Sequence, residues 1–252
     1  MTHDREAYEL HSVVHLVRPS GVRVRTLEEL RAGIAGATAE CLFHHALQYQ
    51  LRDPACHELP PDDLSGWVKG VVQDRETAER LSYAVQNRSA SAAELRQGLR
   101  EVLDALPEPT RATRGAPADG EFVFLAAESV TVPTGVRVND GGELLGALAT
   151  ADASVWFYHV IEQPWFPGSG PSAADWLSAR GEARLAAWLA ESAVSGLPIE
   201  TARRRLLARW RRSHLGRRLA AAAQSPEGVR REEGRAVVAR LVRQIQRPEP
   251  PA

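Results

Sequence analysis

The stretch Gly21-Val22-Arg23-Val24 returns 114 residues later as Gly135-Val136-Arg137-Val138. A segment that recurs at a fixed spacing indicates that a structural unit occurs more than once in the chain. Two copies at a domain-sized spacing predict a tandem duplication and not a solenoid of many short repeats. Residues 121–222 are then expected to repeat the fold of residues 1–106.

The same ungapped frame aligns residues that begin helices. Thr26 falls on Asp140, and each has a glutamate three positions later, as a capping box requires. Thr38 falls on Asp152, a second pair of helix N-cap residues. Both halves are therefore expected to contain helices that start at corresponding positions.

The pattern within the first half predicts strands followed by helices. Residues 8–17 are typical of a strand, Pro19-Ser-Gly of a turn, and residues 22–25 of a second short strand, which together predict a small antiparallel unit. Apolar residues at helical spacing predict helices over 27–35 and 39–51. Asp63 is expected to cap a third helix. Further helices are predicted over 74–86, 91–106 and 200–222, with a last one from Ser225.

These elements predict an α+β fold that is mainly helical, with a tandem duplication of a strand-plus-helices unit and a C-terminal helical extension. Trp67 and Trp176 are expected to be buried core residues, because a tryptophan buries a large apolar area. The predicted domains are a first repeat unit (1–106), a Pro/Gly-rich linker (107–120), a second, divergent unit (121–222), and a basic C-terminal helix and tail (223–252).

Composition limits the class of protein. Of the 252 residues, 44% are hydrophobic and 25% charged, as in a globular protein. No apolar run approaches the roughly 20 residues of a membrane span. Two cysteines give no disulfide framework, so a cytoplasmic protein with no membrane association is expected.

Positive charge gathers at the end of the chain. Residues 197–252 contain 14 arginines and five glutamates, although the whole chain has a net charge of −1. Such asymmetry is typical of a solvated or docked helix face, and also of a surface that binds polyanions. The candidate polyanion-binding residues are Arg204, Arg205, Arg211, Arg212, Arg217 and Arg218. Nucleic acid is a possible partner but is not favoured, because no binding motif is present and the pI is about 6.7.

His45 and His159 are the sharpest candidates for chemistry. They occupy corresponding positions beside the apolar stripe of the second helix in each half. A histidine there can be a general base, a ligand, or a hydrogen-bonded boundary residue, and the last interpretation is favoured. The candidate ligand-binding residues are His44, His45, Gln48, Asp63, Trp67, His159 and Glu162.

No metal or cofactor is predicted. Cys41, His44, His45, Cys56 and His57 are of types that bind zinc, but they lack the paired tight spacings of zinc sites. No phosphate loop, dinucleotide fingerprint or HExxH motif appears. His11 and His15, which correspond to Leu125 and Ser129, are expected on a solvated or boundary face.

Three stretches carry a resemblance to a known family. They are Glu29-Leu-Arg-Ala-Gly-Ile34, Leu42-Phe-His-His45, and Glu58-Leu-Pro-Pro-Asp-Asp-Leu64 followed by Trp67-Val68. They are similar to motifs of domain-of-unknown-function family 5752, so that His45, Pro60, Pro61 and Asp63 would be the family's residues. The resemblance covers residues 8–106, and the second half would be a divergent copy. Ala46 and Leu47 stand where the family has further histidines. The resemblance implies no activity.

These observations favour a non-enzymatic binding or regulatory module that acts through protein contacts or a small ligand. One alternative is an enzyme or metal-dependent site centred on His45, with the second half degenerate. The other alternative is polyanion or nucleic-acid binding by the arginine-rich helices. The partner is expected to be a protein or a small ligand of unknown identity.

Overall fold

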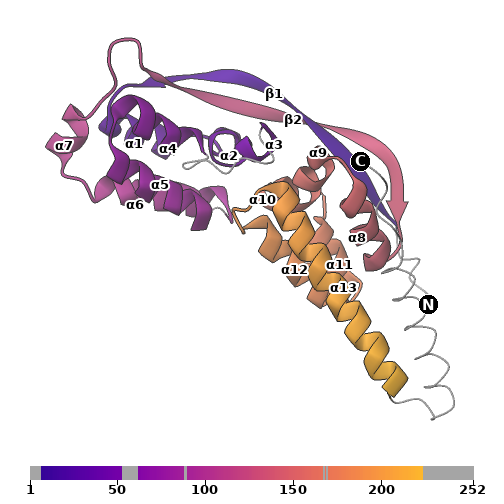
Figure 1. Cartoon of the computed structure of the whole chain (residues 1–252). Coiled ribbons are helices and arrows are strands. Elements are labelled where there is room, and N and C mark those ends of the chain that lie inside the picture. The colour runs from indigo at the N-terminus through magenta and orange to yellow at the C-terminus, as the bar shows by residue number, and fades with distance from the viewer. Residues whose placement is uncertain (1–6, 53–61, 88–89, 167, 169, 224–252) are drawn as a thin grey trace, which may run out of the picture. The chain divides into compact units, whose positions relative to one another are not determined.

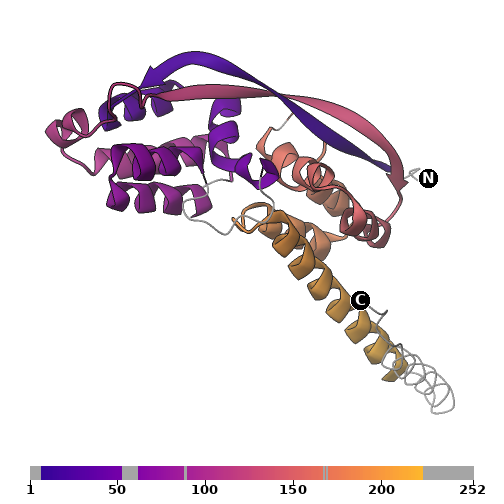
Figure 2. The same ribbon diagram turned by 45° about the horizontal axis from the view of Figure 1, so that its top comes forward.

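The computed structural model describes residues 7–52, 62–87, 90–166, 168 and 170–223 (Figures 1 and 2). It is mainly helical and contains one two-stranded sheet, which confirms the α+β class. The chain forms two compact units, residues 1–206 and 207–252. The elements described below lie in the first unit, except that helix α13 continues into the second.

A long β-ribbon dominates the first unit. Strands β1 (Tyr8–Val24) and β2 (Phe122–Val138) have 17 residues each and pair in antiparallel orientation. The prediction that β1 turns back on itself at Pro19-Ser-Gly is therefore wrong. Gly21 and Gly135 do adopt positive φ angles of 85° and 76°, but the strands continue past them with a shift in register. The positive φ angles produce a bulge in each strand instead of a turn, because each strand continues its pairing with the other strand past the glycine.

The pairing of the ribbon is preserved when each residue is replaced by its counterpart 114 positions away in the other strand. Tyr8 pairs with Val138, and Phe122, which lies 114 residues after Tyr8, pairs with Val24. His15 pairs with Ser129, its own counterpart at that spacing. The ribbon therefore has an approximate twofold axis that passes between His15 and Ser129.

The helices that follow β1 agree with the predicted starts. Thr26 forms the expected capping box with Glu29, and the Thr38 hydroxyl accepts the N–H of Cys41. Asp62, and not Asp63, caps the third helix by accepting the N–H of Ser65. The elements are α1 (Leu27–Gly36), α2 (Ala39–Leu47), α3 (Tyr49–Arg52), α4 (Asp63–Trp67), η1 (Val68–Val72), α5 (Arg75–Asn87), α6 (Ala92–Asp104) and α7 (Glu108–Thr113). The predicted helix over 39–51 is interrupted at Gln48, and helix α7 lies within the predicted linker.

The helices that follow β2 repeat this order at first. Asp140 caps α8 by accepting the N–H of Glu143, whereas Asp152 caps its helix with no side-chain hydrogen bond. Ser172 and Asp175 form a capping box. The elements are α8 (Gly141–Thr150), α9 (Ala153–Trp156), η2 (Phe157–Glu162), α10 (Gln163–Trp165), α11 (Ala173–Ala179), α12 (Ala183–Ala193) and α13 (Ile199–Ala223). The helix predicted from Ser225 lies outside the described residues.

Each end of the ribbon completes a different core. The ring of Phe122, at the start of β2, lies 4.7 Å from that of His45 and 5.7 Å from that of Trp67. The ring of Tyr8, at the start of β1, lies 5.3 Å from that of Trp176. The start of β1 thus packs on helices that follow β2, and Figure 1 shows the ribbon running from α1 to α8. Trp67 and Trp176 are both buried, as predicted.

A glycine of α1 tests this packing. A Cβ atom on Gly33 would lie 2.7 Å from the buried ring of Phe124 in β2, whereas a Cβ atom on Gly36 would meet nothing within 4 Å. We expect Gly33→Ala to lower the free energy of unfolding by about 1–2 kcal/mol, because overpacking outweighs the gain in helix propensity. Gly36→Ala is the matched control and should not destabilise the protein. Urea denaturation measures both, and equal stabilities would contradict the packing described.

Candidate functional site

His45 of α2 is held on both ring nitrogens. Its Nε2 accepts the backbone N–H of Leu125 in β2 at 2.8 Å, and its Nδ1 lies 3.0 Å from Oδ2 of Asp63. A neutral imidazole that accepts at Nε2 carries its proton on Nδ1, so it donates to Asp63. The side chain is 3% exposed. His45 therefore joins a helix, a strand and a carboxylate and has no unused ring nitrogen.

His159 of η2 makes the corresponding contacts. Its Nε2 accepts the backbone N–H of His11 in β1 at 2.7 Å. Its Nδ1 lies 2.7 Å from the Tyr8 hydroxyl and 2.8 Å from Oε1 of Gln163. Burial lowers the pKa of His159 to about 4, so the ring is neutral at physiological pH, as an acceptor must be.

The two histidines accept backbone N–H groups at the points where the ribbon changes register. His11 is paired with Pro133, and Leu125 is paired with Pro19, at the points where the register shifts. A shift in register takes backbone N–H groups out of the ladder, and an N–H that leaves the ladder needs another acceptor. The histidine Nε2 atoms supply it. Both N–H groups beside the register shifts therefore have a partner.

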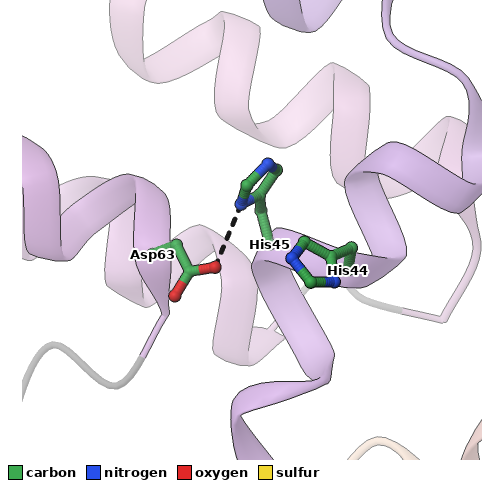
Figure 3. Close-up of side chains that lie close together, drawn as sticks. All are labelled: His44, His45 and Asp63. Carbon is green, nitrogen blue, oxygen red and sulfur yellow. Dashed lines mark hydrogen bonds and ion pairs between the residues drawn. The ribbon is translucent and has the colours of Figure 1, made fainter. Parts of the chain in front are cut away.

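A second group of predicted site residues gathers around His45. His44 Nδ1 lies 2.6 Å from Oε1 of Gln48, and burial lowers the pKa of His44. Asp63 also accepts from Arg52 at 2.7 Å. Although burial opposes ionisation of Asp63, hydrogen bonds from His45 and Arg52 hold its pKa below the usual value. Figure 3 shows the Asp63 carboxylate facing His45, with His44 beside them.

The potential ligand atoms of His44, His45 and Asp63 lie within 4.8 Å of one another, which is close enough for one metal ion. A metal on His45 Nδ1 would move the ring proton to Nε2, which already faces the N–H of Leu125. Two donors would then oppose each other in a buried place, which costs free energy. Cys56 and His57, the other zinc-type residues, lie outside the described residues.

We therefore expect no stoichiometric zinc at this cluster. The protein should be incubated with zinc, desalted, and analysed for bound metal by mass spectrometry. His44→Gln should leave the metal content unchanged. An equimolar zinc content that falls in this variant would contradict the hydrogen-bonding argument.

A cavity of about 720 Å³ lies beneath the ribbon. The ribbon, helices α1 and α2, and the segment from η2 to Phe166 line it, and one side is open to solvent. Its lining residues are Arg18, Pro19, Ser20, Val22, Gly33, Gly36, Ala37, Thr38, Glu40, Cys41, Phe124, Ala126, Ala127, Glu128, Ser129, Thr131, Tyr158, Glu162 and Phe166. Of the predicted site residues, Glu162 lines this cavity, whereas His44, His45, Gln48, Asp63, Trp67 and His159 are not among its lining residues.

Glu162 is buried and pairs with His15. The distance from Glu162 Oε2 to His15 Nε2 is 2.8 Å, and the two side chains are 3% and 10% exposed. The prediction of a boundary face for His15 misses this partner, because the contact joins residues 147 apart. The sequence offers one signal for this ion pair: Glu162 is charged, whereas the corresponding residue of the first half, Gln48, is neutral.

The arginine candidates lie along α13, which confirms the predicted helix. Arg204, Arg205, Arg211 and Arg212 are exposed, whereas the side chains of Arg217 and Arg218 lie outside the described part. Polyanion binding stays a prediction. In the part of the chain that the structure describes, no helix is both long and apolar enough to cross a bilayer.

Comparison with known proteins places this fold. The sequence matches, over residues 5–210, the family described as "Family of unknown function (DUF5752)". The chain belongs to this family. The match extends over both halves, whereas the motifs that carry the resemblance in the sequence cover residues 8–106.

A solved structure has a similar fold. The chain is similar to the structure of OrfY from Thermoproteus tenax, with a TM-score of 0.68 and 23% sequence identity. The similarity covers 81% of this chain and 95% of that chain. A search of the curated proteins gives no match. These comparisons identify family and fold, and the function has to be argued from the site.

Burial of a neutral His159 makes the stability of the protein depend on pH. Its pKa falls from 6.5 to about 4 on folding, so below 6.5 the unfolded chain binds the proton more readily. The stabilisation is complete above pH 6.5 and is lost as the pH falls towards 4. We expect this loss to reach about 3 kcal/mol.

Urea denaturation from neutral pH down to about 4 measures this effect. In His159→Gln, where residue 159 no longer titrates, the decrease in unfolding free energy over this range should be clearly smaller. The same decrease in both proteins would show that His159 is not the group responsible.

Proposed function

We propose that the protein is a non-enzymatic binding module whose small ligand occupies the cavity beneath the ribbon. The observation that supports this most is the size and construction of the cavity. Its volume of about 720 Å³ is within the range of small-molecule sites. Residues from both strands and from helices of both halves line it. A ligand there would contact segments that are far apart in the sequence.

The chemistry of the lining residues favours binding over catalysis. Burial raises the pKa of the Cys41 thiol to about 11, so little reactive thiolate forms at neutral pH. Burial also raises the pKa of Tyr158. His45 and His159, which the sequence favours for acid–base chemistry, use both ring nitrogens elsewhere. Among the described lining residues, none has the partner of an activated nucleophile.

We also infer that the two halves arose by tandem duplication. The support is that corresponding histidines accept N–H groups from corresponding strand residues, since His11 and Leu125 lie 114 positions apart, as His45 and His159 do. The symmetric register of the ribbon supports it independently.

Under this duplication, positions where corresponding residues differ indicate where the two halves have diverged. His15 corresponds to Ser129, and Glu162 corresponds to Gln48. The first pair lies at the ribbon axis, and Glu162 and Ser129 line the cavity. The halves therefore agree in the histidines that support the ribbon and differ where the cavity is. This pattern supports the cavity as the place where one ancestral fold acquired a binding role.

A cavity-filling variant tests the proposal. Thr131 lines the cavity, whereas its neighbour Val130 is 44% exposed and is not among the lining residues. The purified protein should be incubated with a metabolite extract, washed, and denatured to release retained molecules for mass spectrometry. We expect the parent protein and Val130→Trp to retain the same small molecule and Thr131→Trp to lose it.

Circular dichroism and urea denaturation should show that both tryptophan variants remain folded. Equal retention by Thr131→Trp and Val130→Trp would place any ligand outside the cavity. The absence of a retained molecule from the parent protein, together with no response to a panel of pure compounds, would oppose a small-ligand function.

A further inference from the structure

We infer that the cavity beneath the ribbon selects an organic cation that carries an ammonium group, with Glu162 as its counter-charge. The inference rests on the proposed binding function and adds the charge and chemical class of the ligand. It is carried by three features of the lining: its charge, the burial of one of its carboxylates, and its aromatic rings.

The charged side chains of the lining are predominantly acidic. They comprise the glutamates at 40, 128 and 162 and a single cation, Arg18. Arg18, Glu40 and Glu128 are exposed at the rim, whereas Glu162 is 2% exposed. A concave site with an excess of one sign of charge raises the local concentration of oppositely charged ligands. The arrangement thus attracts cations and offers an anion one exposed arginine.

Glu162 is placed to receive an ammonium group within the cavity. It comes from η2, and its Oε2 atom is held by His15 of β1 at 2.8 Å, which fixes the carboxylate beneath the ribbon. A carboxylate accepts hydrogen bonds at both oxygens. An ammonium donor that reaches this group would form a charge-assisted hydrogen bond, which is stronger than a neutral one.

Aromatic rings complete the arrangement. Phe124 of β2, Tyr158 of η2 and Phe166 all line the cavity. The ring of Phe166 lies 5.2 Å from that of Phe43, and Phe124 is 1% exposed, so both are supported by the core. The faces of aromatic rings attract cations, and aromatic walls are the usual means of binding quaternary ammonium groups. A carboxylate beside aromatic rings therefore matches an alkylammonium ligand better than a sugar or an acid.

The test compares cationic, neutral and anionic ligands. Choline, and its uncharged carbon isostere in which a tert-butyl group replaces the trimethylammonium group, should be titrated into the protein. Putrescine provides a primary ammonium group, and succinate provides an anion of similar size. Isothermal titration calorimetry gives the affinity, and amide NMR shifts report the site. We expect choline or putrescine to bind at least about tenfold more tightly than the isostere and succinate.

Variants then assign the counter-charge. Glu162→Gln keeps the shape of the side chain and should weaken binding of the cation by about tenfold or more. Glu79→Gln removes one negative charge from an exposed ion pair with Arg75, outside this cavity, and is the control for net charge. It should leave the affinity unchanged. Thr131→Trp should abolish binding.

The outcomes separate this inference from the proposed function. Equal binding of choline and its isostere, or binding of succinate alone, overturns the cationic ligand while the binding cavity stands. An unchanged affinity in Glu162→Gln overturns the role of that residue. Loss of all binding, with no molecule retained from the metabolite extract, overturns both the cation inference and the binding function.

Discussion

The hydrogen bonds from backbone N–H groups of the ribbon to His45 and His159 are the constraint on which the rest of the structure depends. They hold the two strands to helices α2 and η2 where the pairing shifts past Pro19 and Pro133. A buried N–H without an acceptor costs about 1–3 kcal/mol. Because the histidines fix where the ribbon lies over the helices, they also set the roof of the cavity. Both ring nitrogens of each histidine are engaged in these supporting hydrogen bonds.

The ribbon makes the two halves depend on each other. Residues 1–106 do not include Phe122, which packs on Trp67, and residues 121–222 do not include Tyr8, which packs on Trp176. The helical core of each half is therefore completed by the strand of the other half. The family match likewise extends over both halves. Folding of either core requires contacts between residues far apart in the sequence, such as Leu125 with His45, 80 residues apart, and His11 with His159, 148 residues apart. Such contacts form slowly compared with local helices.

Local chemistry decided which features could be predicted from the sequence. Helix starts at Thr26, Thr38 and Ser172 were predictable because a cap and its partner lie within three residues. The ribbon was not, because the pattern of β1 is compatible with a hairpin, and its true partner lies beyond the helices of the first half. Likewise, His45 was identifiable as unusual, but its acceptor role was not, since the donor is a backbone N–H of Leu125. Every residue except proline has a backbone N–H, so the sequence does not show which residue donates to the histidine.

A ligand in the proposed cavity would contact both halves of the chain beside the axis of the ribbon. The ribbon is nearly symmetric, yet at its axis one strand contributes His15 and the other Ser129. His15 takes its partner, Glu162, from the second half, and the cavity beside this pair is also lined by α1 and α2 of the first half. A ligand at Glu162 would interact with both halves and would stabilise the arrangement in which they enclose it best. A ligand shifts the equilibrium between two arrangements of the halves only by the difference in its affinity for them. Glu162 gives this difference in affinity a physical source, because its carboxylate already binds His15 of the ribbon. Any movement of η2 against β1 would change both the His15 contact and the ligand contact.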